Sequence, residues 1–184
     1  MPDWIQAVDS AILLFFQEVL RLELLNPLVV FYTHLGDAGL MWIVLSLVML
    51  FFPKTRRAGI LALCAMALGL VCNNWMLKHL VQRSRPYLVV TGLVPLVPPP
   101  DPNSFPSGHT CAAFASAITW LRTLPQRWMK GTGVALAVLM GLSRLYVGVH
   151  FPSDVLVGGL VGSLCACLVY ALARYLGQHR GQAL

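Results

Sequence analysis

The sequence predicts an all-α fold: a polytopic transmembrane helical bundle with about five spans and an N-terminal amphipathic helix in the membrane interface. Apolar residues make up 58% of the 184 residues, charged residues only 11%, and the mean hydropathy is +0.73. A soluble domain needs about 25% charged residues to cover its surface. The surplus of apolar side chains therefore predicts a surface that faces lipid.

Five apolar stretches are the candidate spans. Residues 58–77 and 155–173 contain no charge, and about 20 such residues cross a bilayer core. The stretch at 131–149 is equally long and carries one charge, whereas 38–52 and 105–121 are shorter. The length of the chain suits one domain. We therefore expect residues 1–184 to form a single domain.

The N-terminal segment, residues 4–25, is apolar but interrupted by charges. This pattern favours an amphipathic helix in the outer interface, and a sixth crossing is the alternative. The core of the domain is then expected at about 26–176. Residues 87–105 are expected to form an outside loop, because a helix does not tolerate so many prolines. These are Pro95, Pro98, Pro99, Pro100 and Pro102.

The basic residues predict an orientation. They form three groups, between the first and second spans, between the third and fourth, and after the fifth: Lys54, Arg56 and Arg57; Arg122, Arg127 and Lys130; Arg174 and Arg180. Alternate loops share one side, which the positive-inside rule makes cytoplasmic. We therefore expect a multi-pass protein of the cell membrane. The formal charge of +6 does not indicate nucleic acid, since the basic residues are scattered.

Six other charged or titratable residues are expected at the opposite, outer ends of the spans. They are Lys78, Arg85, His109, Arg144, His150 and Asp154. Charges at the membrane are costly, and a cluster of them indicates a functional site. Three cations, two histidines and one carboxylate suit an anion with several oxygens.

The local patterns favour phosphate as that anion. Lys78 and Arg85 are seven residues apart, so two helical turns would project both from one face before Pro86 ends the helix. The run Pro106-Ser107-Gly108-His109 predicts a helix start, whose free N–H groups bind phosphate oxygens. The Ser107 hydroxyl adds a donor, and Gly108 allows close approach of the backbone. Arg144 offers a bidentate guanidinium.

Two histidines supply the chemistry. Asp154 follows His150 by four residues, with Pro152 in the first turn of a helix. A carboxylate there accepts the proton of one ring nitrogen and leaves the other free to attack phosphorus. His109, from another helix, then protonates the leaving oxygen.

The spacing resembles that of a known family. Lys78-x6-Arg85-Pro86, Pro106-Ser107-Gly108-His109 and Ser143-Arg144-x5-His150-x3-Asp154 are similar to the three signature motifs of the type 2 phosphatidic acid phosphatase (PAP2) family. The similarity runs from about Asp9 to the end of the last span. It implies a helical bundle and a covalent phosphohistidine on His150. It also implies Asp154 as orienting partner, His109 as acid, and no metal or other cofactor. The remaining motif residues would bind phosphate: Lys78, Arg85, Ser107, Gly108 and Arg144.

The function predicted from these residues is hydrolysis of a lipid phosphate or diphosphate at the outer face of the membrane. The first candidate substrate is undecaprenyl diphosphate, cleaved to the monophosphate, and the second is phosphatidylglycerophosphate or phosphatidic acid. A vanadate-dependent haloperoxidase and a non-enzymatic lipid-binding or transport protein are the alternatives from other classes. The motifs leave open the substrate, the oligomeric state, and the part that Arg83 and residues 87–105 take in selectivity.

Overall fold

The computed structural model describes residues 2–98 and 101–180 of the chain. All regular structure in that part is helical, apart from one isolated bridge between Ser84 and Asn103. The α-helices are α1 (Asp3–Phe15), α2 (Asn26–Leu35), α3 (Leu40–Leu50), α4 (Arg56–Gly69), α5 (Lys78–Val81), α6 (Pro86–Val89), α7 (Gly108–Thr123), α8 (Arg127–Tyr146) and α9 (Pro152–Arg180). Shorter 3₁₀ or π segments are η1 (Phe16–Leu20), η2 (Glu23–Leu25), η3 (Asp37–Gly39) and η4 (Leu70–Leu77). The predicted all-α fold is confirmed.

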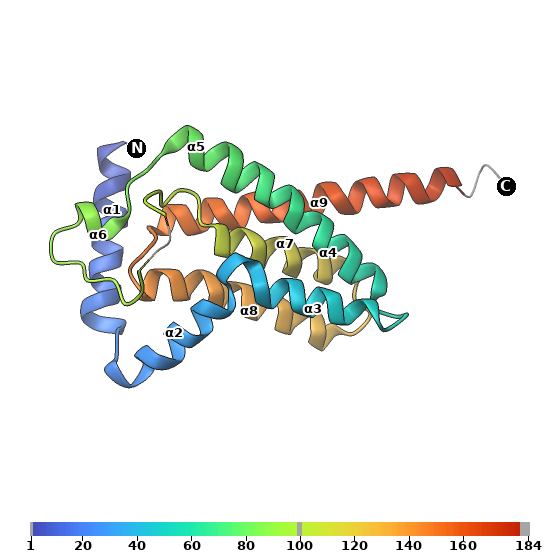
Figure 1. The fold of residues 1–184 in the computed structure, drawn as a ribbon, viewed down its shortest axis with the longest axis horizontal. Helices are drawn as coiled ribbons and strands as arrows, with labels where there is room; N and C mark the ends of the chain where they lie inside the picture. The colour runs from blue at the N-terminus through green and yellow to red at the C-terminus, as the bar shows by residue number, and fades with distance from the viewer. Residues whose placement is uncertain (1, 99–100, 181–184) are drawn as a thin grey trace.

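The longer helices run along the length of the molecule, and α1 lies across one end of them (Figure 1). This is the end at which α8 finishes and α9 begins. α1 contacts α9 there, and its Leu13 is fully buried in an apolar cluster with Phe151. The N-terminal segment is therefore a helix that packs on the bundle end. Whether it lies in the membrane interface stays a prediction.

Helix α7 is the centre of the bundle and packs against α4, α8 and α9. The buried surface of α7 consists largely of small residues (Ala, Ser, Thr and Cys), which let helix axes approach closely. α9 lies close to α7 where a Cβ on Gly158 would fall 2.5 Å from the carbonyl oxygen of Ser107, and a Cβ on Gly162 would meet the carbonyl oxygen of Cys111. Gly158 and Gly162 thus allow contact between α9 and the start of α7.

The predicted number of about five spans is not confirmed. In the described part of the chain, two helices are long and apolar enough to cross a membrane, the continuous Arg56–Val81 and Pro152–Gln178. A third crossing is possible if the bent pair Glu23–Leu35 and Asp37–Leu50 counts as one, with an angle of 52° between its parts. The predicted first span at 38–52 therefore covers only the second half of that pair. α7 has 16 residues, about 24 Å at 1.5 Å per residue, which is less than the bilayer core.

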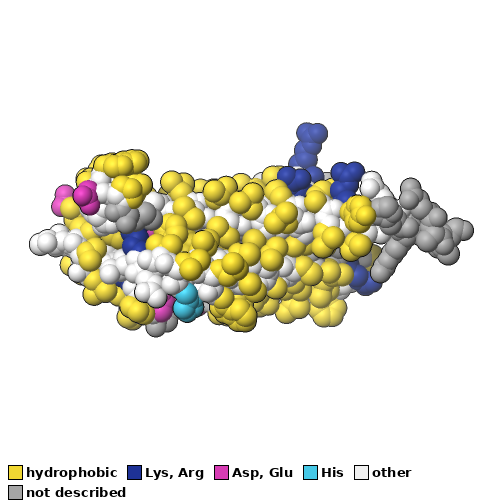
Figure 2. All heavy atoms as spheres, turned by 90° about the horizontal axis from the view of Figure 1, so that it is seen from above, with side chains coloured by type: hydrophobic (Ala, Val, Ile, Leu, Met, Phe, Trp, Pro, Cys, Tyr) yellow, Lys and Arg dark blue, Asp and Glu magenta, His cyan; other side chains and the backbone are white. Residues whose placement is uncertain are grey.

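The two ends of the molecule differ in charge. Figure 2 shows hydrophobic side chains along the length, most of the Lys and Arg of this face toward the end near the C-terminus, and acidic and histidine side chains toward the other. The α3–α4 and α7–α8 connections lie at the C-terminal end (Figure 1). The basic groups predicted to share one side therefore do share one end.

The predicted loop at 87–105 is confirmed over most of its described length. The exception is α6, a single helical turn that begins at Pro86. Pro99 and Pro100 lie outside the described residues.

Candidate active site

The eight predicted site residues meet at the end of the bundle that α1 covers. They come from α5 and the chain after it, the start of α7, the end of α8 and the start of α9: Lys78, Arg85, Ser107, Gly108, His109, Arg144, His150 and Asp154. Burial lowers the pKa of His150, and four of the others lie close enough for their positive charges to lower it further: Arg85, Arg144, His109 and Lys78. The structure thus gathers the three motifs around one histidine.

Lys78 and Arg85 meet in a way that the sequence did not predict. The helix ends at Val81, and Gln82 adopts a left-handed conformation (φ 49°). Arg85 is therefore in extended chain (φ −66°, ψ 148°) rather than two helical turns beyond Lys78. The prediction of one shared helix face is wrong, because the chain turns four residues before Pro86.

The two cations share a carboxylate instead. Lys78 Nζ and Arg85 Nη2 lie 3.0 and 3.2 Å from Oδ2 of Asp101. Partial burial acts to raise the pKa of Asp101, but the hydrogen bond and charge of Lys78, followed by the charge of Arg85, give a net lowering. Asp101 is thus an anion on the two cations that the sequence assigns to phosphate.

His150 is buried and its two ring nitrogens face different groups. Nη1 of Arg85 donates to Nε2 at 3.0 Å, so Nε2 carries the lone pair and Nδ1 the proton. Burial, and then the positive charges of Arg85 and Arg144, hold the pKa of His150 well below its ordinary value. The imidazole is therefore neutral at neutral pH, with Nε2 directed at the cations.

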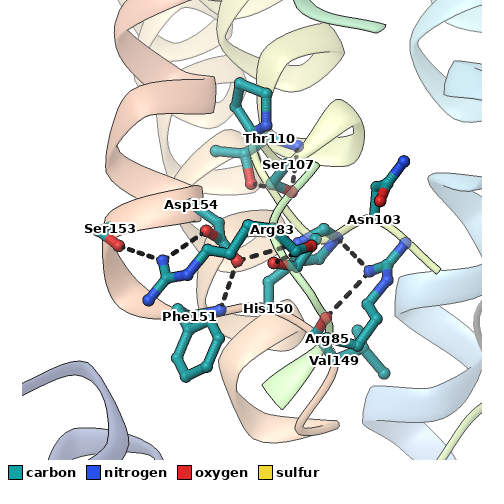
Figure 3. Close-up of polar contacts among 12 residues, drawn as sticks. Arg83, Arg85, Asn103, Ser107, Thr110, Val149, His150, Phe151, Ser153 and Asp154 are labelled. Carbon is teal, nitrogen blue, oxygen red and sulfur yellow. Dashed lines mark hydrogen bonds and ion pairs between the residues drawn. The ribbon is translucent and has the colours of Figure 1, made fainter. Parts of the chain in front are cut away.

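Asp154 lies on the Nδ1 side of the ring, fully buried (Figure 3). Its Oδ2 is 3.7 Å from Nδ1 of His150, which is too long for a hydrogen bond. The same oxygen accepts the Phe151 N–H at 2.8 Å. The expected pairing of Asp154 with His150 is thus present as proximity, and a small shift of the ring would close the bond.

His109 and Arg144 line a cavity of about 320 Å³ together with His34, Asp37 and Val97. Nε2 of His109 is 2.9 Å from Oδ1 of Asp37. Asp37 reaches this position because α2 and α3 are broken beside it, where Ala38 and Gly39 have positive φ. Arg144 Nη1 donates to the Thr33 hydroxyl at 2.6 Å. Among the described residues, no ion pair involves Arg144.

The start of α7 is built as predicted, with Ser107 as the N-cap. The Ser107 hydroxyl accepts a hydrogen bond from the Thr110 hydroxyl at 3.0 Å. The backbone N–H of Ser107 donates to the backbone carbonyl of Asp154 at 3.0 Å. A Cβ at Gly108 would lie 3.1 Å from the amide oxygen of Asn74, so a larger residue would crowd this side chain. Ser107 is fully buried, so it fixes the helix start as well as facing the site.

Arg83, whose part in selectivity the sequence left open, faces away from the cations. Its Nη1 donates to Oδ1 of Asp154 and its Nη2 to Oδ2 of Asp9, each at 2.8 Å. Figure 3 shows Asp154 between the Arg83 guanidinium and the ring of His150. The hydrogen bonds of Arg83 thus go to protein groups on the side of Asp154 away from His150.

Three carboxylates around the site were not predicted: Asp9, Asp37 and Asp101. Asp9 and Asp37 are distant in sequence from the motifs, and Asp101 lies in the loop just before Pro106. Only the fold brings each of them to a cation or a histidine. The signal available was an acidic residue within an apolar segment, as at Asp9. Within residues 2–98 and 101–180, no three His, Cys, Asp or Glu side chains are placed to hold one metal ion.

The arrangement combines a neutral imidazole with an unprotonated nitrogen, a cationic pocket and a second histidine at the pocket wall, and comparison with known proteins gives its family. A family model described as the PAP2 superfamily matches residues 58–178, which include all eight predicted site residues. The chain belongs to the PAP2 superfamily. The resemblance drawn from the motifs is confirmed.

Relatives of this PAP2 protein act on lipid phosphates. An undecaprenyl-diphosphatase from Sulfolobus acidocaldarius is 36% identical over 143 residues, which cover 78% of this chain and 68% of the relative. A phosphatidylglycerophosphatase B from Bacillus subtilis is 32% identical over 163 residues, covering 82% and 76%. The PAP2 protein is thus a lipid phosphatase, and the prediction of an enzyme is confirmed.

A solved structure supports the fold. The crystal structure of a transmembrane PAP2-type phosphatidylglycerolphosphate phosphatase from Bacillus subtilis is similar with a TM-score of 0.77 at 31% identity. The likeness covers 95% of this chain and 89% of that one. It includes the N-terminal part of the PAP2 protein, which the family model does not match.

Proposed function

We propose that this PAP2 phosphatase hydrolyses a lipid phosphate or diphosphate at the outer face of the membrane through a phosphohistidine on His150. The observation that carries the proposal is the position of His150. Its unprotonated Nε2 faces Arg85, while Nδ1 faces the Asp154 carboxylate. A buried neutral imidazole whose lone pair points at a phosphate site is an activated nucleophile.

The reaction has two displacements at phosphorus. Nε2 of His150 bonds to phosphorus as the bond to the leaving oxygen breaks, and His109 donates a proton to that oxygen. Water then attacks the phosphohistidine and gives its proton to His109, so inorganic phosphate leaves and both histidines return to their first state. Lys78, Arg85 and Arg144 stabilise the charge on the other phosphate oxygens in both transition states.

Asp101 defines the starting state of this cycle. Its carboxylate bonds to Lys78 and Arg85, so a substrate phosphate must replace it there. The ion pairs are partly exposed, with the Asp101 side chain 38% accessible, and such pairs contribute about 1 kcal/mol or less. A phosphate with two negative charges is the stronger ligand for the same cations.

Undecaprenyl diphosphate is the substrate we propose first. The support is the similarity to an undecaprenyl-diphosphatase. Phosphatidylglycerophosphate is the second candidate, because a solved structure with that activity in its description covers 95% of this chain. Purified protein should be assayed on both lipids and on phosphatidic acid, and the ratio of kcat/KM values ranks them. An undecaprenyl diphosphate rate below the other two would reverse our order.

The covalent intermediate is the direct test of the chemistry. Turnover of ³²P-labelled substrate, quenched in alkali, should leave acid-labile label on the protein. His150→Ala should remove both label and turnover, a loss of about 10⁶-fold for a covalent nucleophile. Label on His109 would instead exchange the two assignments.

The reaction is proposed to need no metal ion. Three cationic side chains and the N-terminus of α7 provide the positive charge that a metal would supply at the phosphate. Activity in 5 mM EDTA should therefore equal the untreated rate, to be checked by phosphate release. Loss of activity that magnesium or zinc restores would contradict the mechanism.

The outward orientation of the site rests on the basic groups at the opposite end. Thr91 lies exposed in the loop at the site end, and Lys54 is exposed at the other. In a background without the native cysteines, Thr91→Cys should react with a membrane-impermeant maleimide added to intact cells, and Lys54→Cys only after permeabilisation. The reverse pattern would place the site in the cytoplasm.

A further inference from the structure

Arg83 joins the N-terminal helix to the active site. It lies in the chain between α5 and α6, and it is 8% exposed. Nη1 donates to Ser153 Oγ at 2.7 Å as well as to Asp154, and Nη2 donates to Gln6 Oε1 at 2.7 Å as well as to Asp9. All four N–H bonds of the two terminal nitrogens are thus used by protein groups, and the Nε–H is buried without a hydrogen-bond partner among the described residues.

The rest of the side chain is held equally closely. The guanidinium carbon lies 3.8 Å from the centre of the Phe151 ring. The backbone carbonyl of Arg83 accepts the N–H of Ser104 at 2.7 Å. Contacts therefore fix the backbone of Arg83, the plane of its guanidinium and both of its terminal nitrogens. A side chain held in this way can position its hydrogen-bond partners precisely.

Asp9 provides the second anchor, from α1. It is 3% exposed, and besides Arg83 it accepts the backbone N–H of Ser153 at 3.1 Å and bonds to the Ser153 hydroxyl. Asp9 therefore caps the first turn of α9, where helix N–H groups are otherwise unsatisfied. That turn contains Asp154. One arginine and two carboxylates thus tie α1 to the helix start that carries the partner of His150.

The effect on Asp154 is one of orientation and charge. Its Oδ1 is bound to Arg83, and its Oδ2 to the Phe151 N–H. The carboxylate plane is thereby fixed with Oδ2 toward Nδ1 of His150. A fully buried carboxylate is costly without a cation beside it, and Arg83 is the cation that contacts Asp154.

We propose that Arg83 and Asp9 are positioning residues: Arg83, anchored by Asp9 of α1, holds Asp154 as an oriented carboxylate against His150. The inference rests on the proposed nucleophilic role of His150. It makes α1 a part of the catalytic machinery, although α1 lies outside the three motifs. Neither residue contacts the phosphate, so their loss should lower kcat and leave KM nearly unchanged.

The experiment compares variants in detergent by single-turnover rate, KM and melting temperature. Arg83→Gln should lower the rate of phosphoenzyme formation about 100-fold and Asp9→Asn about 10-fold, as is usual for groups that orient a catalytic partner. KM should stay within about 3-fold, since phosphate binding is untouched. Matched controls are Arg57→Gln, an exposed arginine at the far end, and Asp3→Asn, an exposed aspartate on α1. Both should behave as wild type.

A double variant separates positioning from general stability. If Arg83 acts through Asp154, then Arg83→Gln added to Asp154→Asn should cost less than about 3-fold further, because the two share one effect. Additive losses, or a wild-type rate per folded molecule in Arg83→Gln, would overturn the proposal. Should Arg83→Gln not fold, Arg83→Lys and Asp9→Asn decide in its place. A wild-type kcat in both would overturn the proposal equally.

The same data distinguish this inference from the proposed function. If wild-type protein forms no phosphohistidine on His150, the proposed function fails and the positioning role fails with it. If wild type and Arg83→Gln form phosphohistidine at equal rates, only the positioning role fails. A slowed but His150-located phosphoenzyme in Arg83→Gln supports both.

Discussion

Arg83 and Arg85 are two residues apart and nearly equally buried, yet their surroundings are opposite. Arg83 lies between the buried carboxylates of Asp9 and Asp154. Arg85 points to the side of His150 where Lys78 and Arg144 add positive charge, and its carboxylate partner Asp101 is partly exposed. The Arg83 guanidinium, with one positive charge, contacts two carboxylates. The Arg85 guanidinium and the neighbouring cations together have more positive charge than the single Asp101 carboxylate neutralises.

The difference separates support from binding. A cation whose charge is fully compensated by the protein has nothing to offer an anionic ligand. A group of cations short of negative charge is held together at a cost that a bound phosphate removes. Removing residues on each side of His150 should therefore give different combinations of lost rate, lost affinity and changed stability.

Asp154→Asn, on the compensated side, should have the largest effect. The amide can present its NH₂ to the ring and favour the tautomer with a proton on Nε2, which cannot attack phosphorus. By analogy with the carboxylate of serine-protease triads, the rate should fall about 10⁴-fold.

Single-turnover rate and melting temperature should be measured on the same preparation of Asp154→Asn. KM should remain close to that of wild type. A variant that melts earlier but turns over normally would show that Asp154 is only a structural partner of Arg83.

Arg144→Gln, on the undercompensated side, should lower the affinity for phosphate and raise the stability of the folded protein. Arg144 is 3% exposed, and its hydrogen bond goes to the Thr33 hydroxyl. Loss of its charge-assisted bonds to phosphate should cost about 3 kcal/mol, or about 10²-fold in vanadate inhibition. The melting temperature should rise by a few degrees, because a buried unpaired charge has been removed.

Inhibition constants and thermal melts without ligand check both parts of this expectation. A lower melting temperature together with unchanged inhibition would place Arg144 among the structural cations, beside Arg83.

Asp101→Asn should give the smallest change, in the opposite direction. The amide no longer competes with a phosphate for Lys78 and Arg85. Inhibition by vanadate and by inorganic phosphate should therefore strengthen about 3- to 5-fold, the worth of a partly exposed ion pair. Titration of initial rates with each inhibitor measures it, and Asp3→Asn is the control. Weaker inhibition would mean that Asp101 helps to bind the anion.

The motifs predicted the binding side of this comparison better than the supporting side. Lys78 and Arg144 lie near helix ends and His150 lies in the connection between α8 and α9. Composition alone locates these positions, because charge is rare in this sequence. The turn at Gln82 that separates Lys78 from Arg85 could not be predicted, because residues 78–85 contain no Gly or Pro. Asp9 and Arg83 are 74 residues apart in the sequence, so their pairing depends on how α1 crosses the bundle end, which local patterns do not specify.

The predicted number of spans was not confirmed for a related reason. α7 is sheltered by α4, α8 and α9, so its small residues, rather than its length or hydrophobicity, fit it to its place. Rules for membrane spans describe helices that face lipid. A central helix follows the rules of protein interiors instead.

Helix α9 extends well past its neighbours at the C-terminal end (Figure 1). Its 29 residues span about 43 Å, more than the roughly 30 Å of a bilayer core. A helix longer than the hydrocarbon layer adjusts by changing its tilt as the layer thickens or thins. The same rigid rod carries Asp154 in its first turn and supports Ser107 through Gly158. We therefore expect the acyl-chain length of the host lipids to influence, through the tilt of α9, the distance between the Asp154 carboxylate and the His150 imidazole.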